Sequence, residues 1–153
     1  MSYLTQKTIK DKVSFSGIAL HSGLNVNMCV KPAEPNFGIV FKRVDFKDNN
    51  LVYPNFMNVT NTFLNTTIEN QFGVKVSTIE HLMGALFGLG IDNALIEIDN
   101  EEVPILDGSA KEFIEKIINT GLVVSESPIK IIKINKEVKF TDGERFISIE
   151  PSI

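Results

Sequence analysis

Cysteine is almost absent from this sequence, with Cys29 alone among 153 residues. One thiol excludes an intramolecular disulfide, and its place in an apolar run is typical of a small buried strand residue. Histidine is nearly as scarce, with only His21 and His81. A catalytic zinc ion needs three protein ligands and one open position, and neither HExxH nor CxxC spacing is present. The chain alone therefore offers no complete zinc site, although His81 can supply one ligand to a site completed elsewhere.

Long apolar runs and clusters of positive charge are also missing. No run approaches the roughly 20 apolar residues that span a bilayer, and residues 1–11 contain no apolar stretch typical of a signal peptide. Together with the single cysteine, these absences predict a cytoplasmic protein. The net charge is −4 and no segment is dense in Lys and Arg, which argues against nucleic-acid binding. A nucleotide-containing small molecule is compatible with this charge, since it needs only one or two cations.

Residues 76–86 are predicted to be the end of a strand that runs directly into a helix. Ser77 is a typical N-cap residue, and Glu80 three positions later completes a capping box. Four apolar residues follow the i, i+3, i+4, i+7 pattern of one buried stripe: Ile79, Leu82, Met83 and Leu86. Glu80 and His81 lie outside this stripe, and Gly84 and Ala85 one turn later leave open space beside them.

Two interpretations of Glu80 and His81 follow from this spacing. In the first, Glu80 only closes the capping box, and His81 is a core histidine with its hydrogen bonds satisfied. In the second, a metal ion on His81 lies within one water of the Glu80 carboxylate, which is the arrangement that metal-assisted hydrolysis requires. Nucleophilic catalysis is disfavoured, because Ser77 is used as a cap and no base adjoins Cys29.

The order of expected elements predicts an α+β fold, in which a β-sheet has two helices packed on one face. Strands are expected at residues 6–15, 25–31, 38–44, 62–68, 74–76 and 94–98. Residues 16–23 form a glycine-bounded turn that carries His21. The second helix begins after Ser109, with Glu112 completing another capping box, and ends at Gly121. Its buried stripe is expected to contain Phe113, Ile114, Ile117 and Ile118.

Residues 125–128, Ser-Glu-Ser-Pro, have the composition of a linker. We therefore expect residues 1–126 to form a first α+β domain and residues 129–153 to form the opening strands of an incomplete second domain. The strands expected there are at residues 129–134, 136–140 and 145–149. The last two are joined through Asp142-Gly143, a strong hairpin turn signal.

Two long motifs carry a resemblance to a known family. They are STIEHLMGALFGLGIDN at residues 77–93 and VPILDGSA at residues 103–110, supported by GIALHSG at 17–23 and KPA at 31–33. In these motifs, and in order over essentially the whole chain, the sequence resembles the bacterial UDP-3-O-acyl-N-acetylglucosamine deacetylases. Members of this family are zinc-dependent hydrolases that act on an amide of a UDP-sugar, in the committed step of lipid A biosynthesis of Gram-negative bacteria.

The resemblance implies a specific fold and specific roles for several residues. The family has two similar α+β domains that pack helix layer against helix layer, with the active site between them. By resemblance, Glu80 is the general base toward the attacking water and His81 is a ligand of Zn2+. Phe63 and Leu64 match positions that line the substrate passage, and His21 lies in a motif near the active site. These roles favour the second interpretation of Glu80 and His81.

The sequence departs from the family pattern by what it does not contain. The family's other zinc ligands, a histidine and an aspartate in an HKxxD motif, belong to the second domain, as do a catalytic histidine and the acyl passage. None of these can be matched here, so the resemblance implies an N-terminal fragment that is inactive alone. In the enzyme this helix face meets the missing second domain, and in the fragment alone we expect it to be exposed or to be buried by a second copy in a homodimer. The alternative is a stand-alone, non-catalytic α+β domain that binds a partner through the same helix face.

Overall fold

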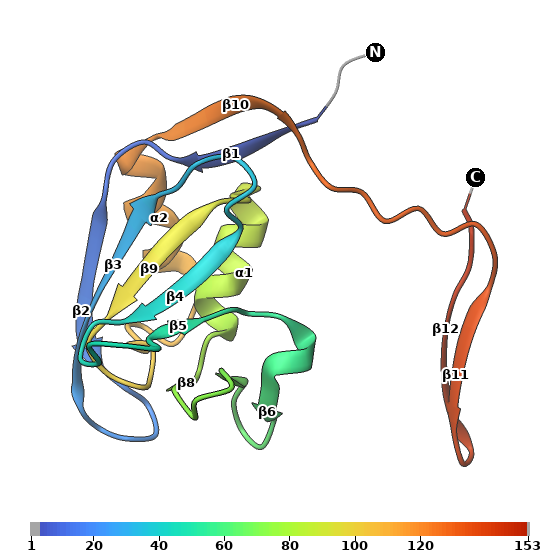
Figure 1. Ribbon diagram of the computed structural model, residues 1–153, viewed down its shortest axis with the longest axis horizontal. Coiled ribbons are helices and arrows are strands. Elements are labelled where there is room, and N and C mark those ends of the chain that lie inside the picture. Colours follow the sequence, from blue (N-terminus) through green and yellow to red (C-terminus); the bar gives the residue numbers. More distant parts are fainter. Residues whose placement is uncertain (1–3, 153) are drawn as a thin grey trace.

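A computed structural model describes residues 4–152, and Figure 1 shows how its layers are arranged. The main sheet has five strands in the order β2-β3-β9-β4-β5. Their bounds are Val13–Ile18 (β2), Asn25–Pro32 (β3), Ile39–Arg43 (β4), Leu51–Val52 (β5) and Ala94–Ile98 (β9). β4 and β9 are parallel, and the other neighbouring pairs are antiparallel. The sequence predicted β3, β4 and β9 to within about one residue at each end.

Two helices, α1 (Glu80–Leu89) and α2 (Lys111–Thr120), cover one face of this sheet (Figure 1). The rings of Phe15 in β2 and Phe113 in α2 are both buried, with 5.0 Å between their centroids. The predicted α+β architecture, with two helices on one sheet face, is therefore confirmed. Neither helix is long enough to span a bilayer, and no other helix within residues 4–152 is long and apolar enough to do so.

Helix α2 confirms most of its predicted pattern. The Ser109 hydroxyl accepts a hydrogen bond from the N–H of Lys111 at 3.0 Å, so Ser109 caps this helix. The predicted capping box with Glu112 is wrong, because the Ser109 N–H donates to Oδ1 of Asp107 at 3.0 Å instead. Gly121 ends it with φ of 92°, and its N–H donates to two carbonyl oxygens of the last turn. Phe113 and Ile117 are buried, but the predicted burial of Ile118 is wrong, because its side chain lies on the outer side of the helix and is 53% exposed.

The opposite face of the main sheet carries charged side chains. Glu97 of β9 lies between Lys31 of β3 and Lys42 of β4, with N–O distances of 2.6 and 3.9 Å. The adjacent residue Ile96 points to the helix side and is fully buried. This alternation is the pattern of a sheet that is covered on one side only. Cys29 pairs with Glu97 and is half-buried, which is less than expected.

A separate two-stranded antiparallel sheet is formed by β1 (Thr5–Ile9) and β10 (Leu122–Pro128). The single strand expected at residues 6–15 is wrong, because a charged bend at residues 10–12 separates β1 from β2. The linker expected at residues 125–128 is also wrong. The Ser125 hydroxyl donates to the Gln6 carbonyl oxygen at 3.0 Å, and the Gln6 side-chain amide donates to the Pro128 carbonyl oxygen at 2.8 Å. Pairing with β1 thus orders a segment whose composition is typical of a loop.

A three-stranded antiparallel sheet follows a short 3-10 helix at Phe56–Asn58. Its strands are β6 (Val59–Asn61), β7 (Thr67–Glu69) and β8 (Lys75–Val76). The predicted turn between the last two is confirmed, since the Asn70 side chain accepts hydrogen bonds from the N–H groups of Phe72 and Val74. The strand expected at residues 62–68 is mostly wrong, because residues 62–66 form a loop.

The end of the chain forms a hairpin of β11 (Val138–Asp142) and β12 (Arg145–Ile149) that stands apart from the other sheets (Figure 1). Its turn confirms the Asp142-Gly143 signal, and Gly143 has a φ of 59°, which glycine adopts without strain. The strand expected at residues 129–134 is wrong, because these residues are irregular and mostly exposed. The division into domains at 1–126 and 129–153 stays a prediction.

Candidate functional site

Helix α1 follows the predicted apolar stripe closely. Its core-facing residues are Ile79, Leu82, Ala85 and Leu86, with Met83 half-buried. Ala85 is completely buried, so the open space expected there beside His81 is wrong, whereas nothing lies near the position of a Cβ atom on Gly84. The helix ends at Gly90, whose φ of 67° is a conformation that glycine adopts without strain.

The predicted capping box at the start of α1 is wrong. The Ser77 N–H and hydroxyl both donate to the carbonyl oxygen of Glu101, at 2.7 and 3.1 Å. The N–H of Val103 in turn donates to the Ser77 carbonyl oxygen at 3.1 Å. Ser77 therefore belongs to a backbone ladder that joins β8 to the loop at residues 101–103, and its hydroxyl does not cap the helix.

Glu80 and His81 both lie off the core, as predicted. Glu80 is exposed, and its Oε2 accepts a hydrogen bond from the backbone N–H of Thr66 at 3.1 Å. His81 is half-buried at the next position of the helix. The Glu80 carboxylate is thus directed to the loop before β7, and the interpretation in which it only closes a capping box loses its basis.

The loop at residues 62–66 places Phe63 and Leu64 at the surface. Their side chains are 78% and 75% exposed. Leu64 has a φ of 62°, which is uncommon for a residue other than glycine and which prevents the predicted strand from continuing here. Since Thr66 binds Glu80, the loop that carries both apolar side chains is attached directly to the start of α1.

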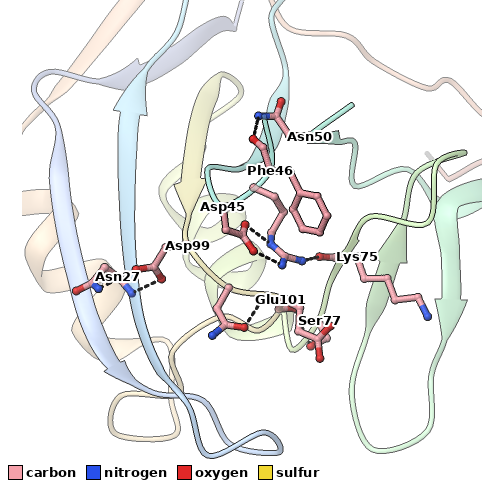
Figure 2. A network of polar contacts seen from close by, with 10 residues as sticks. Asn27, Asp45, Phe46, Asn50, Lys75, Ser77, Asp99 and Glu101 are labelled. Carbon is pink, nitrogen blue, oxygen red and sulfur yellow. Dashed lines mark hydrogen bonds and ion pairs between the residues drawn. The ribbon is translucent and has the colours of Figure 1, made fainter. Parts of the chain in front are cut away.

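Arg43 at the end of β4 fastens the three-stranded sheet to the main sheet. Its guanidinium donates two hydrogen bonds to the Asp45 carboxylate, at 2.8 and 2.6 Å, and one to the carbonyl oxygen of Lys75, at 2.7 Å. Figure 2 shows Asp45, Lys75 and the Phe46 ring around this contact. The guanidinium carbon lies 4.9 Å from the centroid of that ring. Because Lys75 belongs to β8, the contact also holds the strand that leads into α1.

His21 lies in the turn between β2 and β3, and its side chain is exposed. Its backbone N–H donates to Oε1 of Glu102 at 2.9 Å, and the N–H of Ser22 donates to Oε2 at 2.8 Å. Glu102 is only 2% exposed. A buried carboxylate that the sequence did not indicate as a site residue therefore holds the turn that carries His21.

The same carboxylate contacts the segment before α1. The Thr78 hydroxyl donates to Oε1 of Glu102 at 2.9 Å. Thr78 has a φ of 54°, a conformation that is strained for a β-branched residue and that tends to occur at functional sites. Glu102 thus connects the His21 turn to a strained residue two positions before Glu80.

The hydrogen bonds to Glu102 determine its ionisation. Burial raises the pKa of a carboxyl group, but the N–H groups of His21 and Ser22 and the hydroxyls of Ser22 and Thr78 stabilise the carboxylate more strongly. The pKa of Glu102 therefore lies below its usual value. Glu102 is an anion in the folded protein at neutral pH, and it accepts hydrogen bonds from two segments that are distant in the sequence.

A hollow of about 560 Å³ lies between the His21 turn and the three-stranded sheet. Hydroxyl and amide side chains make up much of its lining, including those of Thr60, Asn61, Asn65 and Thr67. Asn65 and Thr67 flank Thr66, whose N–H binds the Glu80 carboxylate, so the loop bound to Glu80 also lines the hollow. The structure thus brings Glu80, His21 and the loop with Phe63 and Leu64 into one region, although these segments are far apart in the sequence.

The part of the chain that the structure describes does not contain a complete zinc site. Within residues 4–152, no group of three or more His, Cys, Asp and Glu side chains is arranged to hold a metal ion. A catalytic zinc ion takes three protein ligands. His81 can be one of them, so these residues can contribute to a zinc site but do not complete it.

Glu102 is the main contact of the site that sequence reasoning missed. It follows the exposed Glu101 in an acidic loop, where no hydrophobic period indicates burial. The available signal is its position directly before the buried Val103. A carboxylate that is itself buried must find hydrogen-bond donors, and here they come from two distant segments.

The chain is similar in sequence to one known family of enzymes over nearly its whole length. A family model described as LpxC: UDP-3-O-acyl N-acetylglycosamine deacetylase matches residues 6–153. Proteins named UDP-3-O-acyl-N-acetylglucosamine deacetylase from Pseudoalteromonas atlantica, Cellvibrio japonicus and Citrifermentans bemidjiense are 43%, 41% and 46% identical to the chain. These matches cover 97%, 97% and 96% of the chain and 49%, 48% and 48% of the relatives. The chain spans about half the length of the curated relatives it matches.

Proposed function

Because this chain belongs to the LpxC family of UDP-3-O-acyl N-acetylglycosamine deacetylases, we propose that the full protein hydrolyses the acetamide of UDP-3-O-acyl-N-acetylglucosamine. The products are acetate and the free amine, in the committed step of lipid A biosynthesis in the cytoplasm of a Gram-negative bacterium. The chain supplies the N-terminal part, with residues 1–126 as a first domain and residues 129–153 as the start of a second. The observation that carries the proposal is the pair Glu80 and His81, side by side in the first turn of α1 and off the core.

Glu80 acts as the general base in this proposal. The hydrogen bond from the Thr66 N–H, at 3.1 Å, orients the carboxylate. A carboxylate has about four lone-pair sites, so capacity remains to accept a proton from an attacking water. The start of a helix also favours a negative charge at this position. These features suit a group that must be ionised, oriented and open to solvent at the same time.

His81 acts as one ligand of a zinc ion. A neutral imidazole is a common zinc ligand, and His81 adjoins the proposed base in the helix. When bound, zinc supplies a water whose pKa is lowered to about 7. The remaining ligands are expected in the half of the relatives' length that this chain does not span. Because His81 is one ligand where a catalytic zinc ion needs three, the chain alone binds zinc weakly and does not deacetylate the substrate at a useful rate.

Phe63, Leu64 and His21 bind the substrate in this proposal. Phe63 and Leu64 are exposed apolar side chains on the loop attached to Glu80, which suits contact with an acyl chain. His21 lines the polar hollow of about 560 Å³, which Asn65 of the same loop also lines. Hydroxyl and amide groups around such a hollow suit the sugar part of the substrate.

The direct test is an assay of the full-length protein and of this chain on UDP-3-O-acyl-N-acetylglucosamine, each with measured zinc content. We expect the full-length protein to release acetate and amine in equal amounts, to lose activity with a chelator and to regain it with zinc. We expect the chain alone to hold little zinc and to release no acetate. A zinc-loaded full-length protein that releases no acetate contradicts the deacetylase proposal. A chain that binds zinc tightly and matches the full-length rate contradicts the incomplete site.

A second candidate function is a non-catalytic domain that binds a partner through its helix face. The observation in its favour is that Phe87 of α1 and Ile118 of α2 are 88% and 53% exposed on the helix layer. Sedimentation of the chain tests this, with a homodimer as the positive result. A strict monomer that also binds no dye specific for apolar surface counts against it.

A further inference from the structure

We propose that Glu102 is a positioning residue of the site, whose carboxylate holds the His21 turn in a fixed place relative to Glu80 and His81. The inference rests on the proposed deacetylase function, because it assigns to that site a residue that does not touch substrate. Glu102 acts through two segments: the turn at residues 21–22 and the residue Thr78 before α1.

The geometry at Glu102 uses both carboxylate oxygens. Oε1 accepts from the N–H of His21 and from the Thr78 hydroxyl, both at 2.9 Å, and Oε2 accepts from the N–H of Ser22 at 2.8 Å. The donors lie 81, 24 and 80 residues away along the chain. Hydrogen bonds of this kind, from N–H and O–H groups to an ionised carboxylate, are about twice as strong as those between neutral groups.

The orientation of α1 depends on the loop that contains Glu102. The ladder between Ser77 and residues 101–103 fixes the backbone before the helix. Thr78 then adopts a left-handed conformation that costs on the order of 1–3 kcal/mol, and its hydroxyl contact with Glu102 favours that conformation. Only Ile79 lies between Thr78 and Glu80, so a shift at Thr78 moves the first turn of α1.

Replacing Glu102 by glutamine separates charge from shape. The amide has nearly the same size, but its NH2 group cannot accept a hydrogen bond. One of the two backbone donors, His21 or Ser22, then faces a second donor and loses its contact. The variant therefore frees the turn while keeping the volume of the buried side chain.

The experiment measures kcat, KM and zinc content of the full-length protein on UDP-3-O-acyl-N-acetylglucosamine, at a temperature at which circular dichroism shows each variant fully folded. We expect Glu102→Gln to lower kcat by about 10- to 100-fold, as removal of partners that orient site residues does, with KM and zinc content near those of the wild type. Thr78→Val, which removes one donor and keeps the β-branched shape, is expected to lower kcat less. Glu34→Gln is the matched control, because it removes a charge from an exposed residue in the loop between β3 and β4, away from the helix layer, and is expected to leave kcat unchanged.

Two results overturn the proposal. One is a fully folded Glu102→Gln variant with the wild-type kcat. The other is a loss of activity that equals the loss of folded protein, which indicates a role in stability alone.

A wild-type protein without deacetylase activity contradicts the proposed function instead, and amide NMR signals then decide the positioning role. If Glu102→Gln shifts the signals of Glu80 and His81 together with those of His21 and Ser22, while Glu34→Gln shifts neither set, Glu102 positions the start of α1. A shift confined to His21 and Ser22 overturns the proposal.

Discussion

The Thr78 hydroxyl donates a hydrogen bond of 2.9 Å to Oε1 of the buried Glu102. This contact joins the strained entry to α1 with the carboxylate that also holds the His21 turn. It explains how Glu80 and His21, which come from distant parts of the chain, are kept in one region without contacting each other directly.

The stability of the fold should depend on pH through Glu102. Its pKa is lowered on folding, so the carboxylate stabilises the folded state fully above the unfolded-state pKa, and this stabilisation is lost as pH falls through the lowered pKa. Urea unfolding from pH 7 to pH 3 should show a steeper loss of unfolding free energy for the wild type than for Glu102→Gln. Equal slopes for the two proteins would contradict the assignment.

The two serines before the helices should differ in importance. Ser109→Ala removes the hydroxyl that accepts from Lys111, and we expect it to lower the unfolding free energy by about 1 kcal/mol, as loss of an N-cap does. Ser77→Ala should cost less, because the Ser77 N–H keeps its 2.7 Å contact with Glu101. Chemical denaturation measures both, and a larger cost for Ser77→Ala would indicate that it caps α1 after all.

Phe113 should contribute far more to stability than Phe87. Phe113 is fully buried against Phe15, and its replacement by alanine is expected to cost about 3–5 kcal/mol through lost burial and a cavity. Phe87→Ala is the control, since that side chain is 88% exposed and should cost little in a monomer. Thermal or urea unfolding compares the two variants. Similar costs would show that the helix layer is covered in solution.

Arg43 should control the stability of the three-stranded sheet. We expect Arg43→Met to lower the unfolding free energy by about 1.5–3 kcal/mol, the value of a hydrogen bond to a charged group, because Asp45 and the Lys75 carbonyl lose their partner. Hydrogen exchange at β8 should become faster. Lys42→Met is the matched control, since its 3.9 Å contact with Glu97 is at the surface and should contribute almost nothing. Unchanged exchange at β8 would contradict the anchor.

The spacing of apolar and capping residues within a segment predicted several helices and strands correctly. The stripe of α1, the ends of α2 at Ser109 and Gly121, and strands β3, β4 and β9 all follow from spacing and side-chain type. These signals depend on neighbours three or four positions away in a helix, or two positions away in a strand, so they can be read without the fold.

The segments that were predicted wrongly owe their structure to hydrogen bonds with residues far away in the sequence. Ser77 was expected to cap α1, but its donors are used by Glu101, 24 residues away. Residues 125–128 were expected to be a linker, but Ser125 binds Gln6, 119 residues away. Glu102 was missed for the same reason, because its donors are close only in the folded chain. Local propensity cannot anticipate contacts of this kind.

The most direct test of the account compares Glu80→Ala and His81→Ala in the full-length protein, with zinc content and kcat measured on the same samples. We expect Glu80→Ala to keep the zinc content of the wild type while kcat falls by about 10²- to 10⁴-fold, the contribution of a general base. We expect His81→Ala to lose zinc itself, and excess zinc to restore part of its activity. Near-wild-type turnover of Glu80→Ala, or tight zinc binding by His81→Ala, would contradict the roles assigned to this pair.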